Sequence, residues 1–561
     1  MDVITHQSNR SSFAEIAADV DRLVGDGVSR ELMIGGAYEG ASQFDRSLAL
    51  WNPPLLSADA EILPEKGTLD ARVRDMRRND GYVQTGQVLH RDHIVGSMYL
   101  LNSTPNTRAL GLDETWAEEF QEEVEAKFML AAESEDRWFD AARKKTLTEM
   151  VRLAVGVYAT GGEALATAEW IRETNRPFKT AIQFVDCDRL STPYDKMNAD
   201  ERIRGGVRQN RYGAPLGYYI RDAHQTDVDR WNDAMEWTYV PARKPWGRLQ
   251  VFHALEEMRI DQSRGVADIV AGLKETRIAK KFRDITLQQA VVSAMYAASI
   301  ESDLPSEAVF AQMGAGNVPP GAAAAQYAGD YLAAIAQYAG SSKHMQIDGV
   351  RIPHFFPGTR LQVRQVGAPG GVGQDFEQSL LRYISAILGV SYEELSHDFS
   401  KTNYSSARAG MLGTWKFMQS RKKIVADRFA NFVYLLWLEE QFNAGEITSL
   451  PRNAPNFYDP LMKEAYGAAT WIGAARGQID EVKETQAAVL RIKYGLSTRE
   501  DELARLGKDW RKVFAQLERE QKDAEKRKLV FVEDNAINAS SGAPREKSAS
   551  EDEGDNKTNG E

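Results

Sequence analysis

Residues 398–410, Asp-Phe-Ser-Lys-Thr-Asn-Tyr-Ser-Ser-Ala-Arg-Ala-Gly, indicate a polar turn that leads into a long helix. The side chains of Asn403, Ser405 and Ser406 are of the types that cap the free amides at a helix N-terminus. The residues that follow favour helix, and apolar side chains recur among them at helical spacing. We therefore expect one continuous helix over residues 405–442.

Composition and length indicate a globular protein with several hydrophobic cores. The 561 residues are 43% hydrophobic and 27% charged, and this length corresponds to roughly three or four units of about 150 residues. The single cysteine, Cys187, excludes an internal disulfide framework and fits a reducing cytosol. The N-terminus lacks a signal-peptide pattern, and the longest apolar run, Phe432–Leu438, is far shorter than the roughly 20 residues of a membrane span. We expect a soluble, intracellular protein.

The order of helical and strand-like segments predicts an α+β fold that is mainly helical. Helical spacing marks residues 69–78, 114–159, 266–298 and 405–442, and also 483–527 with a break near Gly495. Strands are expected at residues 97–101, 180–185, 207–210, 216–220 and 246–253, with a further pair within 350–366. The Ala- and Gly-rich residues 303–345 indicate a loose insertion, and the residues after 535 have the composition of a disordered tail.

Two motifs could support metal or acid–base chemistry. His90 and His93 have a spacing that places two metal ligands on one face of a helix, although an expected strand follows them closely. Asp186 and Asp188 would place two carboxylates on one face of an extended segment, but a turn at the end of a strand is the plainer interpretation. The glycine-rich loop at 367–373 lacks the Gly-Lys-Ser/Thr ending of a phosphate-binding loop.

A basic cluster lies on the helix expected over residues 266–298. Its members are Lys274, Arg277, Lys280, Lys281 and Arg283. One interpretation is a solvated or subunit-contact face, and the other is a belt that touches DNA phosphates. The net charge of −12 argues against a protein that holds nucleic acid tightly, because such proteins usually carry a basic excess.

Four sequence blocks in a fixed order resemble a known family. They are RVRDMRRNDG at 72–81 with the later Val95-Gly96, GGVRQNRYGAP at 205–215 with the following Tyr218–Ile220, RIDQSRGV at 259–266 with the preceding Phe252-His253, and residues 398–410. Together they resemble the lambda-like portal proteins of tailed bacteriophages, over about residues 70–527. The Ala- and Gly-rich segment at 303–345 departs from the pattern of that family.

The resemblance implies a portal-type subunit with a wing, a two-helix stem, a β-rich clip and a helical crown. Placed on this sequence, the parts are an N-terminal segment at 1–60, the first part of the wing at 61–135, the first stem helix at 136–159, the clip at 160–262, the second stem helix at 263–300, the wing with its tunnel loop and long helix at 301–445, the crown at 446–530 and a disordered acidic tail at 531–561.

The resemblance also implies a function. Such subunits form a ring of about twelve copies at one capsid vertex, through which DNA enters and leaves. The implied partners are further copies of the chain, the terminase large subunit, the major capsid and scaffold proteins, the head–tail connector (neck) proteins and the double-stranded DNA in the channel, with no membrane. The protein would be structural rather than an enzyme, without a cofactor, and would reside in the virion after assembly in the bacterial cytoplasm. An acidic chain is compatible with DNA that slides through a channel.

The candidate site residues fall into two groups. The residues expected to face the channel or DNA are Lys274, Arg277, Lys280, Lys281, Arg283, Gly370, Gly371, Val372 and Gly373. The residues expected to make subunit contacts or to have a structural role are Arg259, Gln262, Arg264, Asp398, Asn403, Tyr404, Ser405, Ser406 and Arg408. Two alternatives stay open: a metal-dependent enzyme that uses the His90/His93 and Asp186/Asp188 motifs, and a sequence-independent DNA-binding protein.

Overall fold

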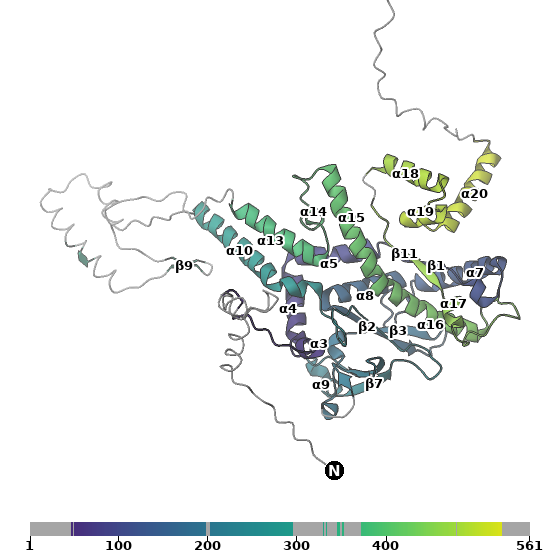
Figure 1. The fold of residues 1–561 in the computed structure, drawn as a ribbon, viewed down its shortest axis with the longest axis horizontal. Coiled ribbons are helices and arrows are strands. Elements are labelled where there is room, and N and C mark those ends of the chain that lie inside the picture. Colours follow the sequence, from purple (N-terminus) through teal and green to yellow (C-terminus); the bar gives the residue numbers. More distant parts are fainter. Residues whose placement is uncertain are drawn as a thin grey trace, which may run out of the picture.

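The computed structural model describes residues 46–48, 50–197, 202–295, 372–477 and 480–529, with short pieces at 329, 332–333, 345–347 and 350–352. Most of the expected N-terminal segment, of the 303–345 insertion and of the acidic tail therefore lies outside the described residues. The described chain forms a body, a pair of helices that projects from it and a small C-terminal lobe (Figure 1). Helices predominate beside small antiparallel sheets, which confirms the α+β class for this part of the chain. Within it, no helix combines the length and hydropathy needed to span a bilayer.

A three-stranded antiparallel sheet lies at the centre of the body. Its strands, in the order β3-β2-β8, are β2 (Glu163–Trp170), β3 (Thr180–Val185) and β8 (Val251–Leu255). Helix α8 (Leu147–Gly161) leads directly into β2 through Gly162, whose φ is 74°. A Cβ atom at Gly162 would lie 2.1 Å from the backbone of Val266, so the turn requires glycine for its conformation and for the close approach.

A four-stranded antiparallel sheet packs beside the first one. Its strands are β4 (Ile203–Arg204), β5 (Val207–Gln209), β6 (Pro215–Arg221) and β7 (Trp237–Pro241), in that order. The chain between β5 and β6 makes the hairpin turn that the sequence predicted. Val207 and Ile220 share a core cluster with Leu165 of β2, which joins the two sheets. The strand expected over 246–253 begins only at Val251.

The N-terminal part of the described chain is mainly helical. Its helices are α3 (Ala58–Ile62), α4 (Lys66–Asn79), α5 (Gly81–Ile94), α6 (Thr107–Leu110) and α7 (Glu114–Ala132). Helix α4 ends where the sequence predicted, but a second helix follows at once. The carboxylate of Asp80 accepts hydrogen bonds from the amides of Tyr82 and Val83, and these bonds cap the start of α5. The strand expected over 97–101 is β1 (Leu100–Ser103).

The single helix expected over residues 114–159 is wrong, because the chain forms two helices there. Residues 133–146 between α7 and α8 form turns and a bridge. Thr146 accepts a hydrogen bond from the amide of Glu149, whose carboxylate accepts one from the amide of Thr146. This capping box starts a new helix, so the stem helix placed at 136–159 is helical only from Leu147 onward.

The long helix expected over residues 405–442 is confirmed. It consists of α15 (Tyr404–Arg421), a π-helical turn (Lys422–Asp427) and α16 (Arg428–Ala444). At the π-helical turn the buried carboxylate of Asp427 accepts from the Tyr99 hydroxyl at 2.5 Å and pairs with Lys422 at 3.2 Å. Beyond the turn, Phe429 packs against Phe184 and Phe252, with ring centroids 5.1 and 5.2 Å away, so α16 covers the central sheet.

The C-terminal part of the described chain divides between the body and a separate lobe. Its elements are α17 (Met462–Tyr466), β11 (Ala469–Ile472), α18 (Glu481–Lys493), α19 (Arg499–Arg505) and α20 (Trp510–Arg527). Strand β11 pairs antiparallel with β1, and Trp471 stacks on Tyr99 at 5.6 Å, so this strand belongs to the body. Helices α18 to α20 form the lobe (Figure 1). The predicted break near Gly495 is confirmed.

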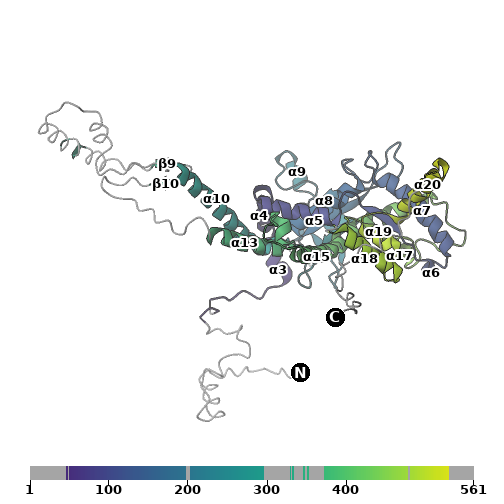
Figure 2. The ribbon, with the colours of Figure 1, turned by 90° about the horizontal axis from the view of Figure 1, so that it is seen from above.

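Two antiparallel helices project from the body (Figure 2). They are α10 (Leu273–Met295), which follows a 3₁₀ turn at Asp268–Gly272, and α13 (Val372–Leu388). Near the body, Gly272 lies against Ile387, and farther out the rings of Phe282 and Phe376 are 5.3 Å apart.

The remaining described elements are short. They are α9 (Trp231–Ala234), α14 (Tyr392–Ser396), β9 (Met345–Ile347), β10 (Val350–Ile352) and 3₁₀ turns at Cys187–Arg189, Tyr194–Lys196 and Val228–Arg230. The β9–β10 hairpin begins earlier in the chain than the strand pair expected within 350–366.

A buried charge cluster holds the start of β2. The carboxylate of Glu163 is fully buried and accepts hydrogen bonds from Arg264 at 2.7 and 3.0 Å and from the amide of Gly265 at 3.0 Å. Lys66 and His253 lie 3.2 and 3.0 Å from the same carboxylate. We call Glu163, Arg264, Lys66 and His253 the Glu163 cluster; it joins α4, β2, β8 and the chain that leads to α10.

The remaining donors of Arg264 are also satisfied inside the protein. Its guanidinium donates to the carbonyls of Cys187 and Leu190 at 2.7 Å each and to that of Gly205 at 3.1 Å. Burial alone would raise the pKa of Glu163, but the charge of Arg264 and the hydrogen bonds from its neighbours hold that pKa well below its usual range. The pair is therefore ionised at neutral pH.

Arg264→Met should destabilise the folded chain by about 3–5 kcal/mol, because it leaves the Glu163 carboxylate buried without its main partner. The measurement is the midpoint of denaturant unfolding. Arg259→Ala is the matched control from the same loop, since Arg259 is exposed and its ion pair with Glu61 should contribute about 0–1 kcal/mol. Equal midpoints for the two variants would contradict the assignment.

The contribution of Glu163 should also depend on pH. Because its folded-state pKa is lowered, the contribution is complete above the unfolded-state pKa of about 4.3 and is lost as the pH falls below that value. The stability difference between the unsubstituted protein and Glu163→Gln should thus be constant near pH 7 and shrink in acid. A difference that grows in acid would contradict this account.

Candidate functional site: a basic helix face and the turn before the long helix

The predicted basic cluster on α10 divides into two sets. Lys280 donates to the carbonyl of Asn79 at 2.7 Å, and Arg283 pairs with the carboxylate of Asp80 at 2.5 Å. These two side chains fasten α10 to the corner between α4 and α5, so they serve contacts within the chain. The exposed members are Lys274, Arg277 and Lys281.

The three exposed residues form one face of α10, which we call the basic face. Lys274, Arg277 and Lys281 are three and four residues apart, which places them on one side of a helix. Large apolar side chains of the same helix are exposed as well, namely Ile278, Ile285 and Leu287. A helix surface that presents both cations and large apolar side chains is suited to contacts with other molecules.

Two of the three residues singled out in the loop before α10 are structural. Arg264 belongs to the Glu163 cluster. Gln262 is buried; its Oε1 accepts from the amide of Met258 at 2.9 Å and its Nε2 donates to the carbonyl of Arg264 at 2.8 Å. Neither side chain is available to a neighbouring subunit. Arg259 is exposed and pairs with Glu61 at 2.6 Å.

The glycine-rich loop proposed to face the channel is only partly described. Gly370 and Gly371 lie outside the described residues. Val372 and Gly373 are the first two residues of α13, so the flexible loop expected through residue 373 ends before Val372. Helix α13 thus begins two residues earlier than the glycine-rich sequence predicted.

Of the three capping residues that the sequence predicted before the long helix, Asn403 is the cap. The Asn403 side chain accepts from the amide of Ser406 at 2.8 Å and from its hydroxyl at 3.0 Å, and the helix begins at Tyr404. Hydrogen bonds from the amide and hydroxyl of Ser400 lower the pKa of Asp398 and fix the start of the turn. The polar side chains exposed at this helix start are Asn403, Ser405 and Ser406.

Arg408 lies where the body meets the C-terminal lobe. It is half-buried and lines a small cavity together with His93 of α5, Glu394 of α14 and Glu484 of α18. The cavity thus brings together side chains of the body, of the long helix and of the C-terminal lobe.

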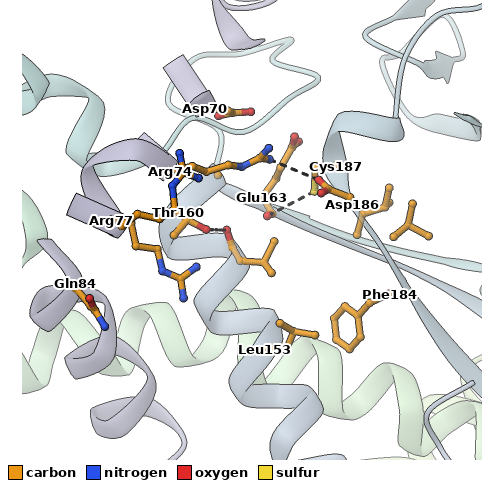
Figure 3. Close-up of a pocket in the computed structure, with 15 residues that line it drawn as sticks. Asp70, Arg74, Arg77, Gln84, Leu153, Thr160, Glu163, Phe184, Asp186 and Cys187 are labelled. Atoms are coloured by element: carbon orange, nitrogen blue, oxygen red, sulfur yellow. Dashed lines mark hydrogen bonds and ion pairs between the residues drawn. The ribbon is translucent and has the colours of Figure 1, made fainter. Parts of the chain in front are cut away.

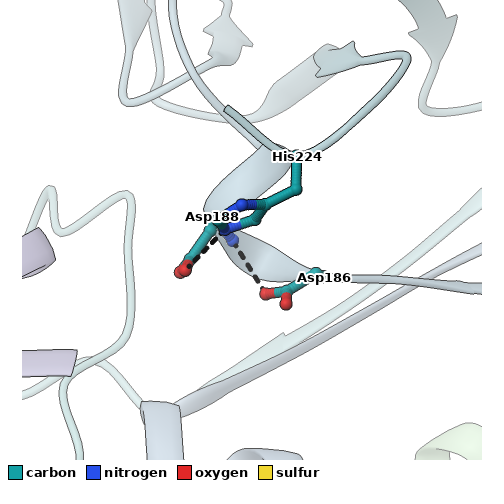
Figure 4. A group of neighbouring side chains, drawn as sticks. All are labelled: Asp186, Asp188 and His224. Carbon is teal, nitrogen blue, oxygen red and sulfur yellow. Dashed lines mark hydrogen bonds and ion pairs between the residues drawn. The ribbon is translucent and has the colours of Figure 1, made fainter. Parts of the chain in front are cut away.

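A carboxylate–histidine cluster lies beside the central sheet (Figure 4). Among the described residues, Asp186, Asp188 and His224 are the group whose ligand atoms, all within 4.8 Å, are close enough to share a metal ion. Asp186 caps the 3₁₀ turn that carries Asp188, so the turn interpretation of this motif is confirmed. His224 reaches Asp188 only through the fold, so no pattern in the sequence indicated its part in this cluster.

An arginine already occupies the position that a cation would take in this cluster. Arg74 donates to Asp188 at 2.8 Å, and its guanidinium lies 3.5 Å from the carboxylate of Asp186. Arg74 and Asp186 both line a cavity of about 560 Å³ (Figure 3). Although burial alone would raise the pKa of Asp188, the hydrogen bonds from Arg74 and His224 lower it. A metal ion would have to displace Arg74 from these carboxylates. The geometry therefore favours a structural role for the cluster, in which Arg74 joins α4 to the residues after β3, over a role in metal binding.

The two histidines of the predicted metal motif bind separate partners. They lie on α5 and not beside a strand. His90 is buried, its Nε2 is 2.8 Å from the carbonyl of Leu388, and burial lowers its pKa. His93 faces Glu394 at 3.4 Å. The pair therefore does not converge on one point as metal ligands would.

Comparisons with known proteins agree with the four sequence blocks. The sequence profile described as "Phage portal protein, lambda family" matches residues 44–422. The portal protein of Escherichia phage N15 is 38% identical over 503 residues, which cover 89% of this chain and 93% of that protein. Portal protein B of Escherichia phage lambda is 36% identical over 496 residues, which cover 88% of this chain and 91% of that protein.

A weaker likeness exists to a solved structure. One chain in the neck of a native gene transfer agent particle, computed with C12 symmetry, aligns with a TM-score of 0.35 and 11% identity, covering 80% of this chain and 99% of that one. The assignment rests on the sequence relatives, which match nearly end to end. The chain belongs to the lambda family of phage portal proteins.

Proposed function

We propose that this chain forms the ring-shaped channel at one vertex of a phage capsid, through which double-stranded DNA is packaged and later ejected. The observation that carries the proposal is the match to the portal family, which spans most of the chain. In this role the ring docks the terminase motor during packaging and the neck afterwards. It contacts the capsid and scaffold proteins at the vertex, and it is assembled in the bacterial cytoplasm.

The projecting helices suggest a different stem from the one placed on the sequence. The family has two stem helices with a clip between them, and α10 and α13 are an antiparallel pair that extends away from the body. Helix α8, by contrast, is buried against α5 and β2. We therefore assign the stem to α10 and α13, in place of the stem at 136–159 and 263–300. With this assignment the clip placed at 160–262 no longer lies between the stem helices, and most of the residues between α10 and α13 lie outside the described ones.

The basic face is the part of this stem best suited to DNA. Among the described residues, Lys274, Arg277 and Lys281 have no bonds within the chain like those of Lys280 and Arg283. In a ring, every subunit would repeat these three charges around the channel. Exposed cations attract phosphates without reading sequence, and they let DNA move when each contact is weak.

Exposed apolar side chains on the helices support self-association. Helix α18 buries none of its residues within the chain. The large apolar side chains exposed on α10, α18 and the turn after α18 are Ile278, Ile285, Leu287, Val482, Val489, Leu490, Tyr494 and Leu496. Exposed apolar side chains in number often mark protein–protein contacts, and head-to-tail contacts in a closed ring would cover those on both the stem and the lobe.

Purified full-length protein should form rings of about twelve copies with a central channel. Electron microscopy of the purified protein is the direct measurement, and mass determination in solution gives the copy number. A stable monomer at high concentration, with no rings in the micrographs, would overturn the proposal.

Replacing Lys274, Arg277 and Lys281 together by Gln should leave the rings intact and weaken their binding to double-stranded DNA. The slope of log K against log salt should become less steep, since each lost phosphate contact changes it by about 0.9. The double variant Lys280→Gln/Arg283→Gln is the control, because these side chains are used within the chain. An unchanged salt slope for the triple variant would contradict the proposal that the basic face contacts DNA in the channel.

Arg408→Ala should impair ring assembly before it affects DNA passage. Loss of the side chain at the junction of the body and the lobe should raise the protein concentration needed for rings by about tenfold, which corresponds to about 1.4 kcal/mol. Size-exclusion chromatography over a dilution series measures this concentration. Lys401→Ala, on the exposed turn nearby, should assemble normally. An Arg408→Ala ring that forms normally and fails only in DNA passage would contradict the assignment.

A further inference from the structure

An exposed apolar segment precedes the first described helix. Residues 50–56, Leu-Trp-Asn-Pro-Pro-Leu-Leu, form neither helix nor strand, and we call them the apolar arm. Leu50, Trp51 and Leu55 are 99%, 69% and 98% exposed. The two prolines favour an extended backbone, because proline fixes its own φ and disfavours the helical conformation in the residue before it. Large apolar side chains that are this exposed often mark a contact with another protein.

The end of the arm is fixed to the body. The guanidinium of Arg259 donates to the carbonyl of Leu56 at 2.9 Å. Just beyond the arm, the buried carboxylate of Asp59 accepts from the amide of Ser263 at 2.8 Å. The arm therefore leaves the body at a defined point. The loop between these two anchors adds further exposed apolar side chains, Met258 and Ile260.

A second exposed surface, an aromatic pocket, lies where the far end of β2 meets the end of α16. Its volume of about 810 Å³ is within the range of about 300–1,000 Å³ that is typical of binding pockets. Its aromatic side chains are Trp170, Trp246 and Tyr458, which are 45%, 57% and 47% exposed. None of them belongs to the basic face, to the Glu163 cluster or to the turn before the long helix.

The polar groups of the aromatic pocket are matched within the chain. Glu439 accepts hydrogen bonds from the indole N–H of Trp246 and the hydroxyl of Tyr458, both at 3.0 Å, and pairs with Arg248 at 3.8 Å. The lining residues include two acids and two bases, so the pocket carries no net charge. It has no excess charge with which to attract an ion. What it offers a ligand is aromatic surface.

The apolar arm and the aromatic pocket have complementary chemistry. Extended, proline-containing segments bind grooves lined by aromatic rings, because their shape is largely formed before binding and little conformational entropy is lost. The arm places Pro53 and Pro54 between large apolar side chains, and it contains no charged residue. An uncharged segment of this kind suits a neutral aromatic pocket.

The arm and the pocket lie at opposite ends of β2. Glu163 at the start of the strand binds Arg264, which follows the loop that anchors the arm, whereas Trp170 at its end lines the pocket. At about 3.3 Å per residue, the strand is roughly 23 Å long. The exposure of Leu55 shows that the arm does not occupy the pocket of its own chain. In Figure 1, α3 and α16 accordingly lie on opposite sides of β2.

We propose that the apolar arm of one copy docks in the aromatic pocket of the next copy, with Pro53 and Pro54 packed on the rings of Trp170 and Trp246. The inference rests on the proposed ring and names one of the contacts that close it. A head-to-tail ring needs two different surfaces on each subunit that fit each other. The arm and the pocket are such a pair, and a closed ring leaves neither of them exposed.

The test is crosslinking of the full-length double variant Leu55→Cys/Asn443→Cys with a short bismaleimide. Asn443 is an exposed residue of the pocket, and the native Cys187 is buried and should not react. We expect a ladder of covalent multimers on a denaturing gel, because the two cysteines meet only between copies. Each single variant should give no ladder. The matched control is Leu55→Cys/Leu517→Cys, whose second site on α20 is 53% exposed, and it should also give none.

The outcomes separate this contact from the ring itself. Rings that form but give no ladder would overturn the docking of the arm and leave the proposed function standing. Protein that forms neither rings nor a ladder would overturn both. Equal ladders from the two double variants would mean that the arm has no specific site, which also overturns the inference.

A charge on the arm should weaken assembly. Leu55→Asp would bring a carboxylate into the neutral pocket and should raise the protein concentration needed for rings by at least about tenfold. Ser57→Asp adds the same charge two residues away, keeps a good cap for α3 and should assemble normally. Because Leu55 is exposed, its substitution should not change the midpoint of unfolding. Normal assembly of Leu55→Asp would overturn the inference. Weaker assembly without a ladder from Leu55→Cys/Asn443→Cys would place the arm on another surface and overturn it as well.

Discussion

The ion pair between Glu163 and Arg264 determines how the segments of the body meet. Arg264 neutralises a carboxylate that has no access to water and also donates to three carbonyls from two other loops. Next to it, Gly265 approaches Gly162 so closely that a Cβ atom would lie 2.1 Å from the Gly162 carbonyl. The chain leaves this contact and enters α10 within a few residues. The pair thus sets the point from which the projecting helices leave the body.

Local signals in the sequence predicted the elements whose causes are local. The caps at Asn403, the hairpin between β5 and β6 and the long helix all follow from neighbouring residues. The break between α7 and α8 also has a local signal, which is the Thr146–Glu149 capping box. The prediction missed the break because helical spacing is strong on both sides of it. The parts that sequence alone could not supply depend on contacts between distant segments. Only the fold shows that Lys280 and Arg283 bind groups of the same chain while Lys274 is exposed. The contact of His224 with Asp188 likewise depends on the fold.

The pairing of β1 with β11 has a consequence for the time course of synthesis. The partners are far apart in sequence; Asn102 contacts Thr470 across 368 positions. On a ribosome that adds about 5–20 residues per second, β1 must wait roughly 20–70 s for its partner strand to emerge. During that interval its edge is open and Tyr99 lacks the indole on which it later stacks. Nascent chains therefore cannot complete the body early, which delays association between copies until each one is nearly finished.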